Sequence, residues 1–204
     1  MQEQARDRIK EILTNYREIA KPLMADISRR HRKGNLTVNI YNEVRALNDH
    51  IARCFKEDTS DERIAVELNK AEGHIRRLLY DCFKQLNVYL HDRVERIERI
   101  CYSSRWLYED GGAFWEKYLQ LKKKSIENVE KAKDMESVDS DEALAFYESG
   151  YKAYRELEEL FKRNKRLLWI SSLSKVGVFL TKAFLWLMIT ATVAIVAAII
   201  VKHM

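Results

Sequence analysis

The feature of this sequence that most constrains its fold is a run of nineteen uncharged, mainly apolar residues near the C-terminus, at positions 183–201. At 1.5 Å per residue, a helix over this run is roughly 29 Å long, which matches the hydrocarbon thickness of a bilayer. A helix buried in a soluble core is rarely apolar on every face over such a length. The run therefore predicts one transmembrane helix over residues 178–201, followed by a short non-cytosolic tail at residues 202–204.

The residues around this run predict how the helix sits in the membrane. Lys182 lies near one end, where its long side chain can carry the ammonium group to the interface, and Trp169 and Trp186 are suitable interface anchors. Residues 162–177 form a basic amphipathic juxtamembrane segment. Basic residues gather before the span and only Lys202 follows it, so the positive-inside rule predicts that the N-terminal domain is cytosolic.

Small side chains inside the predicted span suggest contact between helices. Ala191, Ala194 and Ala198 fall near one side of the helix at spacings of three and four residues. In lipid, such residues let helix backbones approach closely and favour association. Alanine is also common in spans that make no such contact, so the sequence leaves both interpretations open.

The remaining residues, 1–161, have the composition of an all-α domain. The whole sequence holds one proline and six glycines, too few for the turns of a sandwich, a barrel or a wound α/β sheet. The formal net charge of +5 would point to a nucleic-acid partner, but all 31 acidic residues lie in this domain with 29 of the 36 basic ones. Because the domain itself is slightly acidic, its charge does not favour nucleic acid.

Apolar periodicity predicts a bundle of long helices in this domain. The expected helices cover about residues 2–32, 38–55, 61–106, 113–133 and 139–161. Pro22 is expected to bend or divide the first helix, whose buried face should include Leu13 and Ile19. The predicted fold is an all-α bundle with one C-terminal transmembrane helix.

Cysteines and histidines give no metal-binding pattern. Cys54, Cys82 and Cys101 lie far apart within predicted helices and are expected to be core thiols in a reducing compartment. Neither their spacing nor that of the histidines matches a zinc site. We therefore expect neither a metal nor a cofactor.

One pattern in the second predicted helix has the form of a catalytic pair. Arg45 and His50 make an R-x4-H arrangement, which resembles the signature of HEPN-domain ribonucleases. The resemblance implies a HEPN-like bundle in which pairs from two protomers meet in a cleft. There the arginine neutralises phosphate and the histidine polarises the ribose 2′-hydroxyl or the leaving group. The alternatives are a polar surface pair bound to Glu43 or Asp49, and a structural contact between subunits.

A helical cytosolic bundle with a degenerate R-x4-H pair and one membrane span is similar to the small membrane accessory proteins of type VI-B2 CRISPR systems. The resemblance implies an oligomer in the bacterial inner membrane, a functional link to an RNA-guided CRISPR ribonuclease, and a pore-like activity that strengthens antiviral defence. One helix per chain cannot enclose an aqueous path, so such a pore requires a ring of copies, for which cyclic symmetry is the usual arrangement. The sequence does not decide whether the protein binds RNA directly.

Two further sets of residues each have two expected roles. The polar groups just above the span would line a pore, where basic rings favour anions, or else would contact anionic lipid heads. They are Lys162, Arg163, Lys165, Arg166, Ser171, Ser174 and Lys175. The aromatic stripe of Tyr147, Tyr151 and Tyr154 would form core within one chain or contacts between copies.

Three functions are compatible with these patterns. The leading hypothesis is an oligomeric, pore-like inner-membrane protein that enhances RNA-guided defence by perturbing the membrane. The second is a membrane-tethered HEPN-type ribonuclease that uses Arg45 and His50. The third is a tail-anchored helical scaffold that binds a partner by helix packing.

Overall fold

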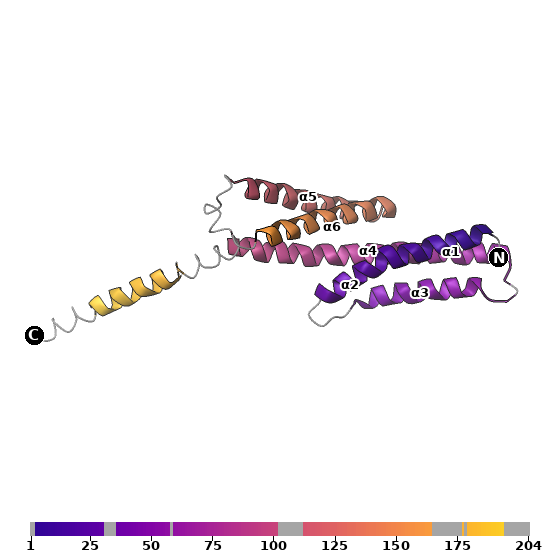
Figure 1. Ribbon diagram of the computed structural model, residues 1–204, viewed down its shortest axis with the longest axis horizontal. Helices are drawn as coiled ribbons and strands as arrows, with labels where there is room; N and C mark the ends of the chain where they lie inside the picture. Colours follow the sequence, from indigo (N-terminus) through magenta and orange to yellow (C-terminus); the bar gives the residue numbers. More distant parts are fainter. Residues whose placement is uncertain are drawn as a thin grey trace, which may run out of the picture.

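The computed structural model describes residues 3–30, 36–57, 59–101, 112–164, 177 and 179–193. Its labelled elements are α1 (Glu3–Asn15), the π-helix η1 (Tyr16–Ala20), α2 (Lys21–Arg30), α3 (Val38–Cys54), α4 (Asp61–Cys101), α5 (Ala113–Met135) and α6 (Ser140–Arg163) (Figure 1). Residues 179–193 form a further helix. These described ranges contain no strand, so the predicted all-α class is confirmed.

Local sequence signals explain where the later helices begin. The carboxylate of Asp139 accepts hydrogen bonds from the N–H groups of Asp141 and Glu142, at 2.9 and 3.0 Å, and so caps α6. Gly112 precedes α5 with a φ of 94°, a conformation that glycine adopts without strain. The helices predicted over residues 38–55, 113–133 and 139–161 are confirmed to within two residues at each end. The predicted residues 31–32 and 102–106 lie outside the described residues.

A π-helical turn, rather than a simple bend, divides the first predicted helix ahead of Pro22. Pro22 has no N–H, so the carbonyl of Glu18 loses the donor that an α-helix would supply. The N–H of Lys21 bonds instead to the carbonyl of Tyr16, five residues back. The division expected at the proline is therefore real, but it takes the form of a widened turn on the N-terminal side.

The widened turn changes which side chains of this region are buried. It rotates the chain less per residue than an α-turn does, so Ala20 is fully buried while Ile19 is 42% exposed. Leu13, in the helix before the turn, is 44% exposed. The prediction that Leu13 and Ile19 face the core is therefore wrong, whereas Ile9 and Ile12 are buried as expected.

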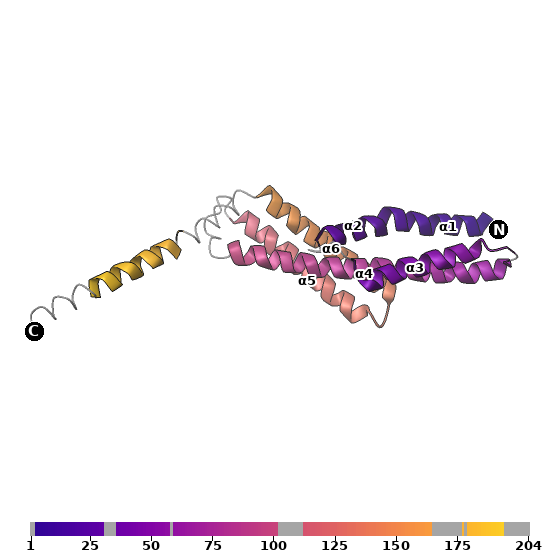
Figure 2. The same ribbon diagram turned by 90° about the horizontal axis from the view of Figure 1, so that it is seen from below.

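The 41-residue helix α4 is the axis of the fold. The N-terminal helices α1, α2 and α3 lie along one half of it, and α6 packs against the other half and against α5 (Figures 1 and 2). One hydrophobic cluster runs along α4 from Ile64 to Leu86, and a second contains Leu90 and Val94 together with residues of α5 and α6. Because both clusters use one continuous helix, α4 couples the two halves of the bundle.

The aromatic stripe of α6 lies in this core. Tyr147 and Tyr154 are 1% and 2% exposed, and the ring of Tyr151 packs 5.5 Å from that of Phe83. Of the two roles expected for the stripe, core within one chain is confirmed, and a contact between copies through Tyr147 and Tyr154 is wrong because their side chains are already covered.

The cysteines within the described side chains are buried, as predicted. Cys54 and Cys82 are 4% and 0% exposed, and both are free thiols. Burial raises the pKa of Cys82 to about 12, which keeps this thiol unreactive. The side chain of Cys101 lies outside the described residues.

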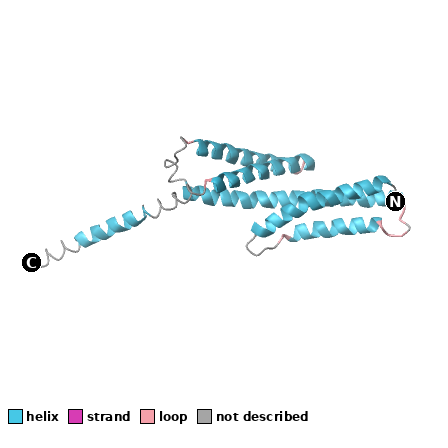
Figure 3. Cartoon of the chain, viewed as in Figure 1, coloured by secondary structure: helices cyan, strands magenta, loops and turns pink. Residues whose placement is uncertain are grey.

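The predicted transmembrane helix over residues 178–201 lies partly outside the described residues, which omit residue 178 and residues 194–201. The described part, residues 179–193, is helical (Figure 3). Its apolar side chains are exposed, with Phe179 at 71%, Leu185 at 63% and Trp186 at 72%. Over the ranges that the structure describes, no helix is long and apolar enough to cross a membrane.

Candidate functional site

The predicted pair Arg45 and His50 lies on α3, but the two side chains do not converge. Five residues at about 100° each place them roughly 140° apart around the helix axis. The side chain of His50 is 13% exposed against α4, whereas Arg45 faces solvent. Among the described residues, the Arg45 side chain has no hydrogen bond or ion pair. Within one chain, therefore, the pair forms no catalytic cleft.

His50 belongs instead to a charged cluster between α3 and α4. Its Nδ1 lies 2.6 Å from Oε2 of Glu67, and Lys70 Nζ lies 3.1 Å from the other oxygen of that carboxylate. Hydrogen bonds from His50 and Lys70 lower the pKa of the buried Glu67 to about 2. The expectation that His50 pairs with Glu43 or Asp49 is therefore wrong, because the packing of α3 on α4 brings Glu67 closer.

A second histidine stacks on His50. The ring centroids of His50 and His74 are 5.1 Å apart, with an angle of 18° between the planes. His74 Nδ1 lies 2.7 Å from Oε2 of Glu43, which also accepts a hydrogen bond from Nε of Arg77 at 3.2 Å. Because each imidazole is bound to its own carboxylate, the cluster serves to fix α3 against α4.

No arrangement for a metal ion is found in the part of the chain that the structure describes. There, no group of three or more histidine, cysteine, aspartate or glutamate side chains is placed to hold one. The stacked histidines are directed to carboxylates on opposite helices instead of to a common point.

Three arginines surround one buried carboxylate where α2, α4 and α6 meet. Glu158, with a side chain only 5% exposed, binds Arg30, Arg93 and Arg155 at 2.9, 3.0 and 2.8 Å. Asp26 binds Nε of Arg30 at 3.0 Å. Burial would raise the pKa of Glu158, but the hydrogen bond and charge of Arg30, with the charge of Arg93, lower it. This network ties the N-terminal helices to α6.

Sequence reasoning missed both buried carboxylates, although the pattern held a signal for each. Glu67 precedes Ala71 by four residues, and Glu158 follows Tyr154 by four, so each lies on the apolar stripe of its helix. A charged residue on such a stripe requires a partner when buried. The pattern could not have identified the partners from other helices, namely His50 for Glu67 and Arg30 and Arg93 for Glu158.

The predicted pore or headgroup residues are only partly within the described chain. Lys162 and Arg163 occupy the last turn of α6, where positive charge favours the helix C-terminus, and Lys162 Nζ lies 2.6 Å from Oε1 of Glu159. The remaining members, Lys165, Arg166, Ser171, Ser174 and Lys175, lie outside the described residues.

The predicted packing face of the span is also only partly described. Ala191 lies in the helix of residues 179–193 and is exposed, as a residue that contacts another helix would be in the isolated chain. Ala194 and Ala198 lie outside the described residues.

The fold and its buried charge networks define the class of this protein as an all-α bundle built along one long helix. Comparison with known proteins finds no matching protein family, no curated protein of significantly similar sequence and no solved structure of significantly similar fold.

Proposed function

We propose that this chain is a single-pass protein of the bacterial inner membrane, with its helical domain in the cytosol, that acts without catalysis as an oligomer. The observation that carries the proposal is the exposure of large apolar side chains on the helix of residues 179–193. Nine of them are 54–72% exposed, namely Phe179, Leu180, Phe184, Leu185, Trp186, Leu187, Met188, Ile189 and Val193.

These side chains surround the helix. Residues 184–189 are six consecutive exposed apolar positions, and at about 100° per residue they pass through every direction around the axis. A protein partner would cover one face of such a helix, whereas lipid covers all of them at once. The sequence continues without a charged residue to Val201, which supports a span of full length.

The action that we propose is a pore-like perturbation of the membrane in support of an RNA-guided CRISPR ribonuclease. The resemblance described above supports this role, and the single span requires that several copies form a ring to enclose any aqueous path. The ribonuclease alternative gains no support from the site, because Arg45 and His50 point to different sides of α3 and His50 is bound to Glu67.

Extraction of membranes with alkaline carbonate tests the anchor. We expect the wild-type chain to stay with the vesicles. We expect Ile189→Lys to release part of it, because a lysine at the centre of a span costs about 2.5–3.5 kcal/mol of insertion free energy. Ile189→Ala is the matched control and should stay bound. Complete extraction of the wild-type chain would contradict the proposal.

Two further measurements test the assembly and its action. The protein mass of the detergent-solubilised particle should correspond to several copies of the 24.2 kDa chain. Cells that express the protein with its ribonuclease partner should lose membrane potential during infection, which a voltage-sensitive dye reports. A monomeric particle together with an unchanged membrane potential would contradict the pore-like action and leave the tail-anchored helical scaffold as the remaining hypothesis. RNA cleavage by purified protein that disappears in His50→Ala would favour the ribonuclease alternative instead.

A further inference from the structure

Helix α3 lies at the edge of the bundle and packs chiefly against α4, so its outer face is open (Figure 1). Positions 38, 41, 45, 48, 52 and 55 on this face are all exposed, at spacings of three and four residues. This is the spacing of the positions through which two long helices pack side by side. Three members are large and apolar, namely Val38, Tyr41 and Phe55, at 71%, 56% and 62% exposure. The outer face of α3 therefore has the pattern of a helix-packing surface.

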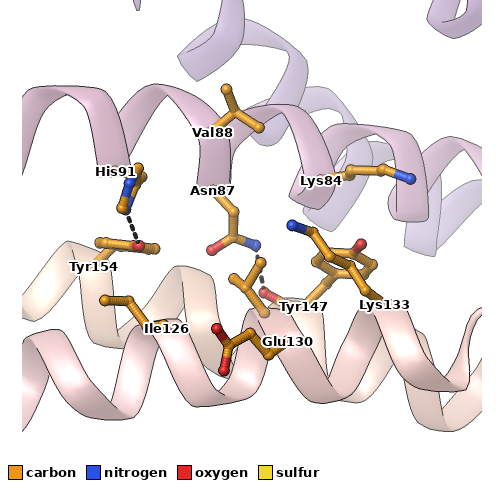
Figure 4. Close-up of a pocket in the computed structure, with 10 residues that line it drawn as sticks. Lys84, Asn87, Val88, His91, Ile126, Glu130, Lys133, Tyr147 and Tyr154 are labelled. Carbon is orange, nitrogen blue, oxygen red and sulfur yellow. Dashed lines mark hydrogen bonds between the residues drawn. The ribbon is translucent and has the colours of Figure 1, made fainter.

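Two charged groups on the same face lack partners within the chain. Arg45 and Asp49 are both exposed and lie one turn apart, and neither makes an ion pair or hydrogen bond with the described residues. Elsewhere the bundle joins many polar groups in pairs. Figure 4 shows one example, in which Nδ1 of His91 lies 2.8 Å from the hydroxyl of Tyr154. The opposite charges on α3 are available to a partner that presents the same two groups.

We propose that α3 pairs with α3 of a second copy, in antiparallel orientation, across a two-fold axis at Asn48. Tyr41 and Phe55 lie seven residues on either side of Asn48, so Tyr41 of one copy meets Phe55 of the other. The two Asn48 amides meet at the axis, where a hydrogen bond between them fixes the register. The symmetry repeats each off-axis contact, so the aromatic pair occurs twice.

The charges on the face select the antiparallel orientation. At 1.5 Å per residue, Arg45 of one copy and Asp49 of the other lie on the same side of the axis, about 3 Å apart along the helices. This offset is within reach of an arginine side chain, and the small Ala52 of the other copy leaves room for it. A parallel pair would instead place Arg45 against Arg45, where like charges repel.

His50 takes no part in this contact, because its side chain is directed to α4 and bound to Glu67. The pair is therefore structural and differs from a catalytic cleft that would combine Arg45 and His50 of two protomers. A contact of this symmetry closes at two copies and cannot itself build a larger ring. The inference thus does not depend on the ring proposed above.

Disulfide crosslinking of the full chain in membrane vesicles tests the axis. Asn48→Cys brings two thiols together at the axis, and we expect mild oxidation to link the chains as dimers. Gln120→Cys, at an exposed position on α5, is the matched control and should give no more dimer than the wild-type chain. Equal dimer fractions in the two variants would overturn the proposal.

Two further cysteine variants test the orientation. Tyr41→Cys and Phe55→Cys chains expressed together should link to each other. Neither should link to itself, because two copies of either position lie about 21 Å apart along an antiparallel pair, too far for a disulfide. Self-linkage of either variant would show a parallel pair and overturn the proposal.

Exchange of the two charges tests the contact between Arg45 and Asp49. In the Asn48→Cys chain, Arg45→Asp and Asp49→Arg should each lower the dimer fraction by about fivefold or more, because each places like charges together on both sides of the axis. The double variant restores opposite charges and should recover the dimer. Both positions are exposed, so circular dichroism should stay unchanged. A double variant as weak as the single ones would show that the two charges do not meet.

The outcomes of these tests are separate from those of the membrane proposal. A chain that resists carbonate extraction but gives no Asn48→Cys dimer would overturn the α3 pair and leave the membrane anchor standing. A chain that forms the dimer but is extracted by carbonate would support the α3 pair and contradict the anchor.

Discussion

Gly73 and Gly150 lie in the middle of helices but differ in what surrounds them. A Cβ atom at Gly73 would meet only the guanidinium of Arg77, at 3.6 Å, which is an ordinary contact with the far end of a mobile side chain. A Cβ atom at Gly150 would press on Val129 and Asn87. The same substitution should therefore have opposite effects at the two positions.

We predict that Gly73→Ala raises the free energy of unfolding by about 0.5–1 kcal/mol, the gain in helix propensity. Gly150→Ala should lower it by about 1–2 kcal/mol, because crowding of about 1–3 kcal/mol outweighs that gain. Urea denaturation of the two variants beside the wild type measures both changes. A stabilised Gly150→Ala variant would show that Val129 and Asn87 move aside freely.

At the same scale, Glu136 ties the end of α5 to α4 and α6. Its carboxylate accepts hydrogen bonds from the hydroxyl of Tyr147, at 2.5 Å, and from Nζ of Lys84, at 2.9 Å. Burial opposes ionisation of this group, but hydrogen bonds from Tyr147, Lys84 and Tyr80 lower its pKa to about 2. The folded protein therefore holds the ionised form more tightly than the unfolded chain does.

This shift predicts the direction of a pH effect. The pKa of Glu136 falls from an ordinary 4.5 to about 2 on folding, so the unfolded chain takes up the proton first as the pH falls. The stabilisation is complete above pH 4.5 and is lost as the pH falls toward 2. Glu136→Gln should melt at a lower temperature than the wild type at pH 7, and the gap should close toward pH 2. Glu57→Gln, at an exposed position, is the control, and a gap that does not change with pH would contradict the assignment.

At the scale of elements, apolar periodicity predicted where most helices begin and end because those limits depend on local chemistry, such as the cap at Asp139. It did not predict the π-turn, since a helix can accommodate the backbone N–H that Pro22 lacks by a bend, a break or a widened turn. It also could not pair Glu67 with His50, because that contact depends on the rotation of α3 against α4.

Helix α4 carries both hydrophobic clusters, so it should make them unfold together. Leu68 lies in the first cluster and Leu90 in the second, at 1% and 0% exposure. We predict that Leu68→Ala and Leu90→Ala each cost about 2–5 kcal/mol and that each shifts one single transition. The neighbouring exposed changes Val66→Ala and Val88→Ala should cost less than about 0.5 kcal/mol. Two separate transitions in calorimetry, with each variant moving only one, would show that α4 does not couple the clusters.

At the scale of the whole molecule, the hydrophobic core of the bundle and the C-terminal helix have no described residue in common. The last residue of either hydrophobic cluster is Phe161, and the cap of α6 is complete at Asn164, whose N–H bonds to the carbonyls of Leu160 and Phe161. None of the described buried residues comes from positions 177–193. The bundle therefore owes its stability to residues before the apolar run.

A variant that ends at Asn164 should therefore keep the fold of the helical bundle but no longer bind membranes. We predict a midpoint of urea unfolding close to that of the full chain in detergent, because both hydrophobic clusters and the Arg30–Glu158 contact remain. In flotation with anionic vesicles, the full chain should rise with the lipid and the shortened one should stay at the bottom, because it lacks the exposed apolar helix. Flotation of the shortened variant would place the membrane contact on the bundle itself, and its failure to fold would mean that the C-terminal residues contribute to the core.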